Sequence, residues 1–103
     1  MKQTEYSKAI KEQCEYSIEL LDSKSQEYAE NNEDRLIHFK KAASLMGTNQ
    51  KQAIFSMLSK HIISISEMIA SGETYTLDRW TEKISDAINY LLILKAAVVE
   101  ELD

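Results

Sequence analysis

The stretch TLDRWTEKISDAINYLLILKAAVV, residues 76–99, predicts one long amphipathic helix. Thr76 stands where an N-cap side chain accepts a backbone hydrogen bond at the start of a helix. Apolar side chains then recur at three, four or seven positions, which places them on one helix face. The residues of this face are Leu77, Trp80, Ile84, Ile88, Leu91 and Val98. Because such a face must be covered by neighbouring elements, we expect this helix to be part of a helical bundle.

Three further helices are expected before it. The first spans residues 4–28, the second ends at residue 46 and the third spans residues 50–71. Their apolar residues recur at the same helical spacings. These residues are Tyr6, Ile10, Cys14, Ile18 and Leu21 in the first helix, Leu36, Phe39, Ala43 and Met46 in the second, and Ile54, Met57, Leu58, His61, Ile65, Met68 and Ile69 in the third.

Residues that begin and end helices separate these segments. Asn49 is an N-cap candidate for the third helix. Gly47 and Gly72 are placed to end the second and third helices in the left-handed conformation. The polar segment 29–34, AENNED, is expected to be a connection in which one of the two asparagines caps the second helix.

The composition supports an all-α fold in one domain. The chain has 103 residues, no proline and two glycines, so it lacks the turn residues that a many-stranded sheet needs. A chain of this length can form a single core, yet a second copy often completes the burial at this size. We therefore expect one domain, residues 1–103, folded as a four-helix bundle and associated as a homo-oligomer, either a dimer or a tetramer.

Charge and hydropathy argue against several classes of partner. The formal net charge is −5, and basic residues cluster no further than the pair Lys40 and Lys41, so binding to a nucleic acid is not expected. The most apolar run, residues 87–99, is interrupted by polar residues and is too short to span a bilayer. The single cysteine, Cys14, cannot form an intrachain disulfide, which fits a reducing compartment. We expect a soluble, cytoplasmic protein.

A polar stripe on the last helix is the main candidate for a site. Glu82, Asp86 and Asn89 lie at offsets of four and three, so they share one helix face. This face runs into the apolar segment 90–94, and a polar group beside so apolar a segment needs a partner. The carboxylates of Glu82 and Asp86 are therefore candidate ligands of Mg²⁺. The alternatives are a solvated acidic face, or an interhelical contact of Asp86 and Asn89 that fixes the helix register.

Three residues elsewhere are candidates to complete this site. Lys60 is placed to face Asp86 or a ligand phosphate, and its alternative is a solvated position. His61 lies among apolar residues of the third helix, where a hydrogen-bonded histidine at the core edge is favoured over a metal ligand. Asp34 lies four positions before His38, and it joins the same centre if the second helix begins above the fourth. Otherwise its negative charge interacts favourably with the dipole at the start of the second helix.

Three segments together resemble a known group of proteins. They are DRLIHF at residues 34–39, SKHIISI at residues 59–65 and EKISDAINYLLIL at residues 82–94. They resemble small phage and prophage proteins of the DUF1599-like group, which is associated with nucleotide modification and is similar to the all-α MazG-type nucleoside triphosphate pyrophosphatases. The resemblance covers residues 24–100. It implies a helical bundle that associates through its helices and binds a nucleotide together with magnesium.

By position, the resemblance implies that Glu82 and Asp86 hold magnesium. Ligand-binding roles fall to Lys60, His61, Asn89 and Asp34. The chain departs from the pyrophosphatase pattern at Lys83, where those enzymes usually place a further ligand. We therefore expect a nucleotide-binding protein, for which two functions are possible. One is a magnesium-dependent pyrophosphatase; the other is a non-catalytic acidic protein that sequesters a nucleotide signal or docks on a host protein and modulates it. We assign no catalytic residue.

Overall fold

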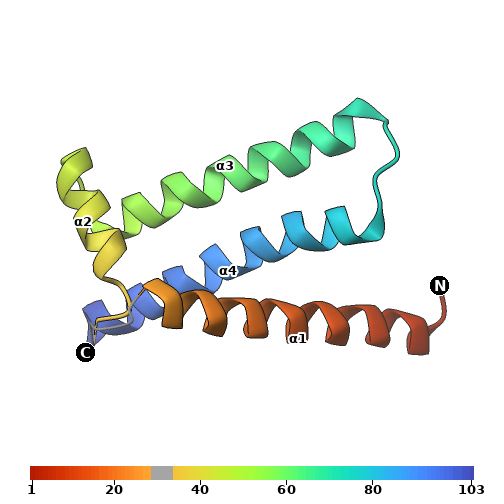
Figure 1. Ribbon diagram of the computed structural model, residues 1–103, viewed down its shortest axis with the longest axis horizontal. Helices are drawn as coiled ribbons and strands as arrows, with labels where there is room; N and C mark the ends of the chain where they lie inside the picture. The colour runs from red at the N-terminus through yellow and green to blue at the C-terminus, as the bar shows by residue number, and fades with distance from the viewer. Residues whose placement is uncertain (29–33) are drawn as a thin grey trace.

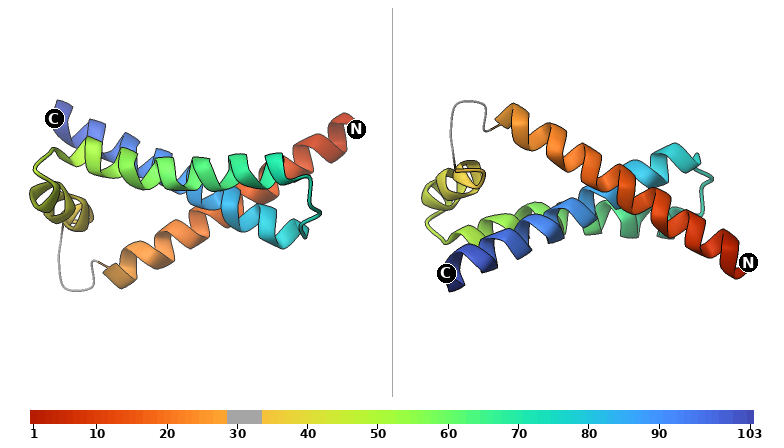
Figure 2. Two further views of the ribbon diagram at one scale, coloured as in Figure 1. Left: turned by 90° about the horizontal axis from the view of Figure 1, so that it is seen from above. Right: turned by 90° about the horizontal axis from the view of Figure 1, so that it is seen from below.

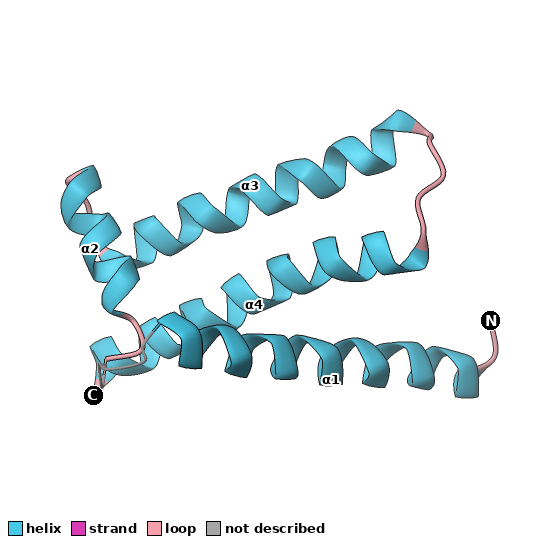
Figure 3. Cartoon of the chain, in the orientation of Figure 1, coloured by secondary structure: helices cyan, strands magenta, loops and turns pink. Residues whose placement is uncertain are grey.

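The computed structural model describes residues 1–28 and 34–103 and is all-α (Figure 1). The four helices are α1 (Gln3–Tyr28), α2 (Ile37–Met46), α3 (Gln50–Ser71) and α4 (Leu77–Leu102). Short connections join α2 to α3 and α3 to α4, and the described part of the chain contains no strand (Figure 3). The expected four-helix bundle is confirmed.

The helix α4 is the central element of the bundle. It forms an antiparallel hairpin with α3 and packs against α1 on its other side (Figure 1). The helix α1 crosses α4 at an angle, so its amino-terminal half extends beyond the contact (Figure 2). The short α2 packs against the start of α3, at the end of the hairpin where the chain terminates.

The ends of the later helices follow local rules of capping. The side chains of Asn49 and Thr76 each accept a hydrogen bond from the backbone N–H three residues later, at 2.9 Å and 3.1 Å. Gly47 and Gly72 end α2 and α3 with φ values of 68° and 69°, in the left-handed region that a Cβ disfavours. All four predictions are confirmed.

The start of α2 is shaped by Asp34. The expected caps, Asn31 and Asn32, lie outside the described residues. The N-cap position is Leu36, which makes no side-chain capping bond. Instead, Oδ1 of Asp34 accepts a hydrogen bond from the backbone N–H of Leu36 at 2.9 Å. This turn satisfies one of the donors that a helix start leaves without an intrahelical partner.

The hydrophobic core is small and lies where α2, α3 and α4 meet. Leu36, Ile54 and Ala97 are buried in it, with partly buried apolar side chains of α2 and α4 packed around them. Ile54 is fully buried, whereas Ala97 contributes only a methyl group. The core therefore depends strongly on one large side chain, and it leaves much of the apolar surface of the long helices uncovered.

The contact between α1 and α4 is polar rather than apolar. Nε2 of Gln13 donates to Oγ of Ser85 at 2.7 Å and to Oγ of Ser17 at 2.9 Å, and both serines are buried. Small serine side chains allow the two helices to approach closely. The expectation that the apolar stripe of α1 enters the core is wrong, because the crossing covers only part of the helix. Ile10 and Ile18 remain 50% and 54% exposed.

Part of the predicted core face of α4 also lies on the surface. Leu77, Ile84 and Leu91 are 79%, 37% and 51% exposed. The described part of the chain therefore leaves this line of side chains uncovered. The prediction that these residues form the core is wrong for the single chain.

Within the described residues, one helix, α3, is long and apolar enough to cross a membrane by length and composition. A core helix of a soluble protein passes the same test. Ile54 and Leu58 of α3 are buried inside the bundle, whereas Phe55, Ile62 and Ile69 are exposed, and 22% of the apolar stretch of this helix is buried.

Candidate functional site

A cavity of about 590 Å³ opens where all four helices or their connections come together. This volume is within the range of small-molecule sites, about 300–1,000 Å³. The lining residues are Leu21 and Lys24 of α1, Arg35, Leu36, His38 and Phe39 at the start of α2, Met57 and His61 of α3, and Asp86, Asn89, Tyr90, Leu92, Ile93 and Ala96 of α4. Most of this wall is apolar, and a few polar groups converge on it, which is the usual composition of a binding site.

Aromatic rings form one wall of the cavity. The imidazole of His61 stacks on the ring of Tyr90, with centroids 5.1 Å apart and planes inclined by 21°. Phe39 and Tyr90 form a T-shaped pair, with centroids 6.3 Å apart and planes inclined by 87°. This geometry follows from the antiparallel hairpin, which brings α3 against α4. Three rings from three helices thus present flat and edge surfaces to whatever fills the cavity.

The imidazole of His61 also faces Asp86, the one carboxylate among the described residues of the lining. Nδ1 of His61 lies 3.6 Å from Oδ2 of Asp86, and both side chains are about three-quarters buried. Asp86 and Tyr90 are four residues apart on α4 and therefore point to the same side of that helix. Asp86 and Tyr90, on one face of α4, thus together fix the position and the orientation of the His61 ring.

Asn89 is the most buried polar residue of the cavity wall. It is 7% exposed, and its buried Oδ1 accepts no hydrogen bond from the described residues. An unsatisfied buried acceptor costs about 1–3 kcal/mol of stability. A ligand donor that reached this oxygen would remove that cost, so Asn89 is a strong candidate for a ligand contact.

Among the described residues that line the cavity, positively charged side chains outnumber negatively charged ones. Lys24 and Arg35 contribute two positive charges to the lining, whereas Asp86 contributes one negative charge. The chain as a whole has a formal charge of −5. A cationic pocket on an acidic protein favours an anionic ligand over a cation. Arginine adds a planar set of donors that suits phosphate and carboxylate groups.

The structure brings three of the six predicted site residues together. His61, Asp86 and Asn89 all line the cavity. Lys60 and Glu82 are exposed and do not line it. Lys60 is about 100° around α3 from His61, whereas Glu82 shares the face of Asp86 but lies one turn earlier on α4. The magnesium expectation for Glu82 and Asp86 stays a prediction. Among residues 1–28 and 34–103, no three of His, Cys, Asp and Glu gather where they could hold a metal ion.

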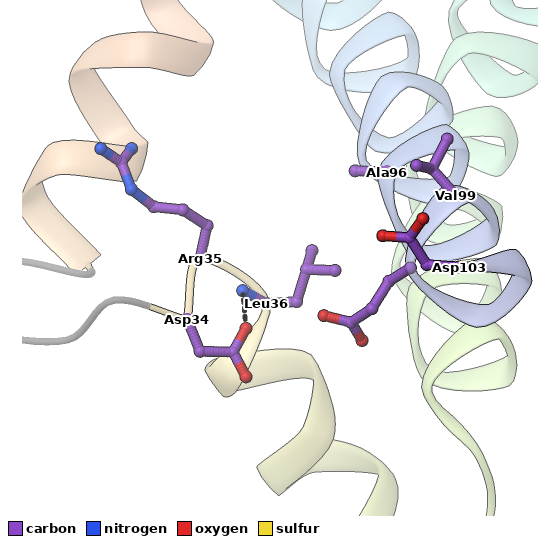
Figure 4. Close-up of a pocket in the computed structure, with 7 residues that line it drawn as sticks. Asp34, Arg35, Leu36, Ala96, Val99 and Asp103 are labelled. Atoms are coloured by element: carbon purple, nitrogen blue, oxygen red, sulfur yellow. Dashed lines mark hydrogen bonds between the residues drawn. The ribbon is translucent and has the colours of Figure 1, made fainter.

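Asp34 lies beside the cavity and takes part in a different contact. In Figure 4, Asp34 and Leu36 face the end of α4, whereas the side chain of Arg35 points away from it. Nζ of Lys40 donates to Oδ2 of Asp34 at 2.6 Å and lies 3.0 Å from Oε1 of Glu100. Lys40 therefore ties the start of α2 to the end of α4, and the structural role of Asp34 is the one its contacts support.

These contacts shift two pKa values in opposite directions. The hydrogen bond from Lys40, with that from the backbone N–H of Leu36, lowers the pKa of Asp34. The hydrogen bonds to Asp34 and Glu100 raise the pKa of Lys40. A lowered carboxyl pKa stabilises the fold above the ordinary value of 3.8, and this contribution is lost as the pH falls through the folded-state value. A raised lysine pKa stabilises below 10.5, and this contribution is lost as the pH rises through the folded-state value.

We expect Lys40→Met to lower stability at pH 7 and to reduce the loss of stability on acidification. Both favourable contributions are complete between about pH 4 and pH 10, and removing the lysine removes both. Urea unfolding at pH 7 and at pH 3 measures the effect. Lys41→Met, at an exposed position of the same helix, is the control and should keep the wild-type pH dependence. An unchanged pH dependence in Lys40→Met would contradict the role of this pair.

Several residues of the cavity were not selected from the sequence. The sequence pattern places Phe39 on the apolar face of the second helix and Tyr90 in the apolar segment 90–94, and it does not mark Lys24 or Arg35 as ligand contacts. The spacing of Asp86 and Tyr90, four residues on one helix, was the available signal for Tyr90. No local signal marks Lys24, because its place depends on how α1 crosses α4.

Comparison of the chain with protein-family models, with curated proteins and with solved structures gives no match. The resemblance to nucleotide-associated phage proteins therefore stays a prediction. The geometry of the cavity is the basis for a functional proposal.

Proposed function

We propose that this chain binds a small ligand that combines a flat ring with an anionic group, and that a nucleotide is the ligand class that fits best. The observation that carries the proposal is a cavity whose wall combines aromatic rings, two cationic side chains and Asn89, whose buried Oδ1 accepts no hydrogen bond from the described residues. Each of these features matches a different part of a nucleotide. Their presence in one cavity is more specific than any one of them.

The base is the part of the ligand that fits the inner wall. A flat heterocycle packs well against the rings of Phe39 and Tyr90. An N–H donor on the edge of the base would satisfy Oδ1 of Asn89. The phosphate fits the cationic rim, where Lys24 and Arg35 supply charge and hydrogen-bond donors.

Binding without catalysis is the form of the function that the lining residues favour. Asp86 is the one carboxylate among the described lining residues, and it faces His61. Magnesium-dependent hydrolysis of a nucleotide normally uses several carboxylates around the metal. A magnesium-dependent pyrophosphatase remains the second candidate because a carboxylate that orients an imidazole is an arrangement used for proton transfer. In the first case the protein sequesters its ligand, which suits the small phage-type protein that the sequence resembles.

Ligand binding is tested by calorimetry and thermal shift with purified protein. The panel contains nucleosides, nucleoside mono-, di- and triphosphates, and inorganic phosphate, each with and without magnesium. We expect a nucleotide to bind more tightly than its nucleoside and more tightly than phosphate alone. At a free ligand concentration of about a hundred times the Kd, binding should add about 2.7 kcal/mol to the free energy of unfolding. A panel without any stabilising compound would contradict the proposal.

The role of the cationic rim is tested by Arg35→Gln. Loss of a charged hydrogen bond to phosphate is worth about 1.5–3 kcal/mol, so affinity for the nucleotide should fall at least tenfold, with little change for the nucleoside. Lys11→Gln removes an equal charge from an exposed position of α1 and should bind as the wild type does. Equal losses in both variants would show a general charge effect instead. Pyrophosphate release with magnesium in the same panel would favour the enzyme over the binding protein.

A further inference from the structure

The side of the α3–α4 hairpin that faces away from the cavity is apolar and uncovered. Its residues, here called the hairpin face, are Phe55, Ile62 and Ile69 of α3, at 54%, 50% and 69% exposure, and Leu77, Ile84 and Leu91 of α4, at 79%, 37% and 51%. Each set recurs every seven residues and so follows one line along its helix. This spacing is the one by which helices usually pack against other helices.

The two lines of the hairpin face lie on the same side of the hairpin. Successive residues of a helix are about 100° apart, so Ile62 is about 140° around α3 from Met57 of the cavity wall. By the same rule, Leu91 is about 160° around α4 from Ile93, which also lines the cavity. The helices α3 and α4 pack against each other, so one side of the pair holds the cavity and the other holds the hairpin face.

The chain exposes more surface than a monomer of its size normally does. Its accessible surface is 7702 Å², whereas the scaling for folded monomers gives about 5,900 Å² at this mass. The excess of about 1,800 Å² per chain is within the range that obligate homodimers bury, about 1,000–2,500 Å² on each partner. The radius of gyration is 15.7 Å, against about 13 Å expected for a compact domain of this length.

We propose that the hairpin face binds the same face of a second copy of this chain. The two hairpins then stack as a four-helix contact that buries the six residues of both copies. A two-fold interface needs a patch that complements itself, and a face that is apolar along its whole length meets this condition. The heptad pattern that predicts a core face on α4 is then satisfied between chains rather than within one. The cavities remain open on the outer sides, so ligand binding and association are independent.

Light scattering and sedimentation equilibrium of the full chain test the proposal. We expect the mass of a dimer, and we expect Ile62→Glu to weaken association at least a hundredfold because it buries a charge at the centre of the interface. Ile18→Glu is the matched control, since Ile18 is an isoleucine of nearly equal exposure on α1. It should remain dimeric. A monomeric wild-type chain, or equal dissociation of both variants, would overturn the proposal.

Cross-linking keeps the test decisive if Ile62→Glu fails to fold. Cys14 is exposed and is first replaced in a Cys14→Ser background. Ile62→Cys in that background lies near the middle of the hairpin, where a two-fold axis would pass. A short bismaleimide should then join two chains through position 62 but not through Ile18→Cys. Cross-linking at position 18 alone would overturn the proposal.

A lipid surface is the competing occupant of the hairpin face. Co-sedimentation with vesicles of phosphatidylcholine and phosphatidylglycerol distinguishes the two. We expect no binding of the wild-type chain to the vesicles. Binding that Ile62→Glu abolishes would assign the face to a bilayer and overturn the proposal. Ligand binding by a folded Ile62→Glu monomer would show that the proposed function holds whatever the outcome for the interface.

Discussion

Ile54→Ala is expected to lower the free energy of unfolding by about 2–5 kcal/mol. Ile54 is fully buried between α2, α3 and α4, and it is the largest fully buried side chain among the described residues. Its neighbours in the core, Leu36 and Ala97, cannot fill the space because both are fixed by their own helices. A domain of this length has about 5–15 kcal/mol of stability in total, so the change removes a large share of it.

Urea unfolding followed by circular dichroism, at one fixed protein concentration, measures this loss. Ile18→Ala removes the same atoms from a position that is 54% exposed, and it should change stability by no more than about 0.5 kcal/mol. Equal losses at positions 18 and 54 would show that the two isoleucines are equally buried in solution. That result would contradict the core described here.

Local chemistry explains why the helix boundaries could be predicted from the sequence. Asn49 and Thr76 cap their helices with their own side chains, and Gly47 and Gly72 adopt a backbone conformation that glycine favours. None of these features depends on the rest of the fold. These helix ends are set by contacts between residues that are only a few positions apart in the sequence.

The candidate site could be predicted only in part, because it depends on how the helices meet. The spacing of Asp86 and Asn89 placed both on one face of α4, and both line the cavity. Glu82 shares the approximate face, yet it lies one turn too early and remains exposed. Lys24 and Arg35 enter the site through the positions of α1 and the start of α2, which no local pattern specifies.

The apolar stripes show a second limit of the same kind. Periodicity correctly identifies Leu77, Ile84 and Leu91 as one apolar line, but it does not say whether the covering element belongs to the same chain. The single chain leaves this line exposed. The amphipathic pattern of a small protein therefore predicts which side chains need to be covered. The structure is needed to show which of them the single chain leaves exposed.

Asn89→Leu is expected to raise stability and to weaken ligand binding at the same time. Oδ1 of Asn89 is buried and accepts no hydrogen bond from the described residues, so an apolar side chain removes an unmet acceptor. The gain should be about 1–3 kcal/mol, and leucine also has the higher helix propensity. The two side chains have the same branched shape, and the cavity beside this position gives room for the slightly larger volume of leucine. Affinity for the nucleotide should fall roughly ten- to a hundredfold, because a donor of the ligand loses its acceptor.

Ser85→Ala provides the control of opposite sign, one turn earlier on the same helix. Ser85 is as buried as Asn89, but its hydroxyl accepts from Gln13 and donates to the carbonyl oxygen of Thr81. Its removal should cost about 1 kcal/mol and leave ligand binding unchanged. Urea unfolding and calorimetry on both variants separate the two roles. If Asn89→Leu were destabilising to the same degree as Ser85→Ala, Asn89 would hold a structural contact, and this result would contradict its proposed role in ligand binding.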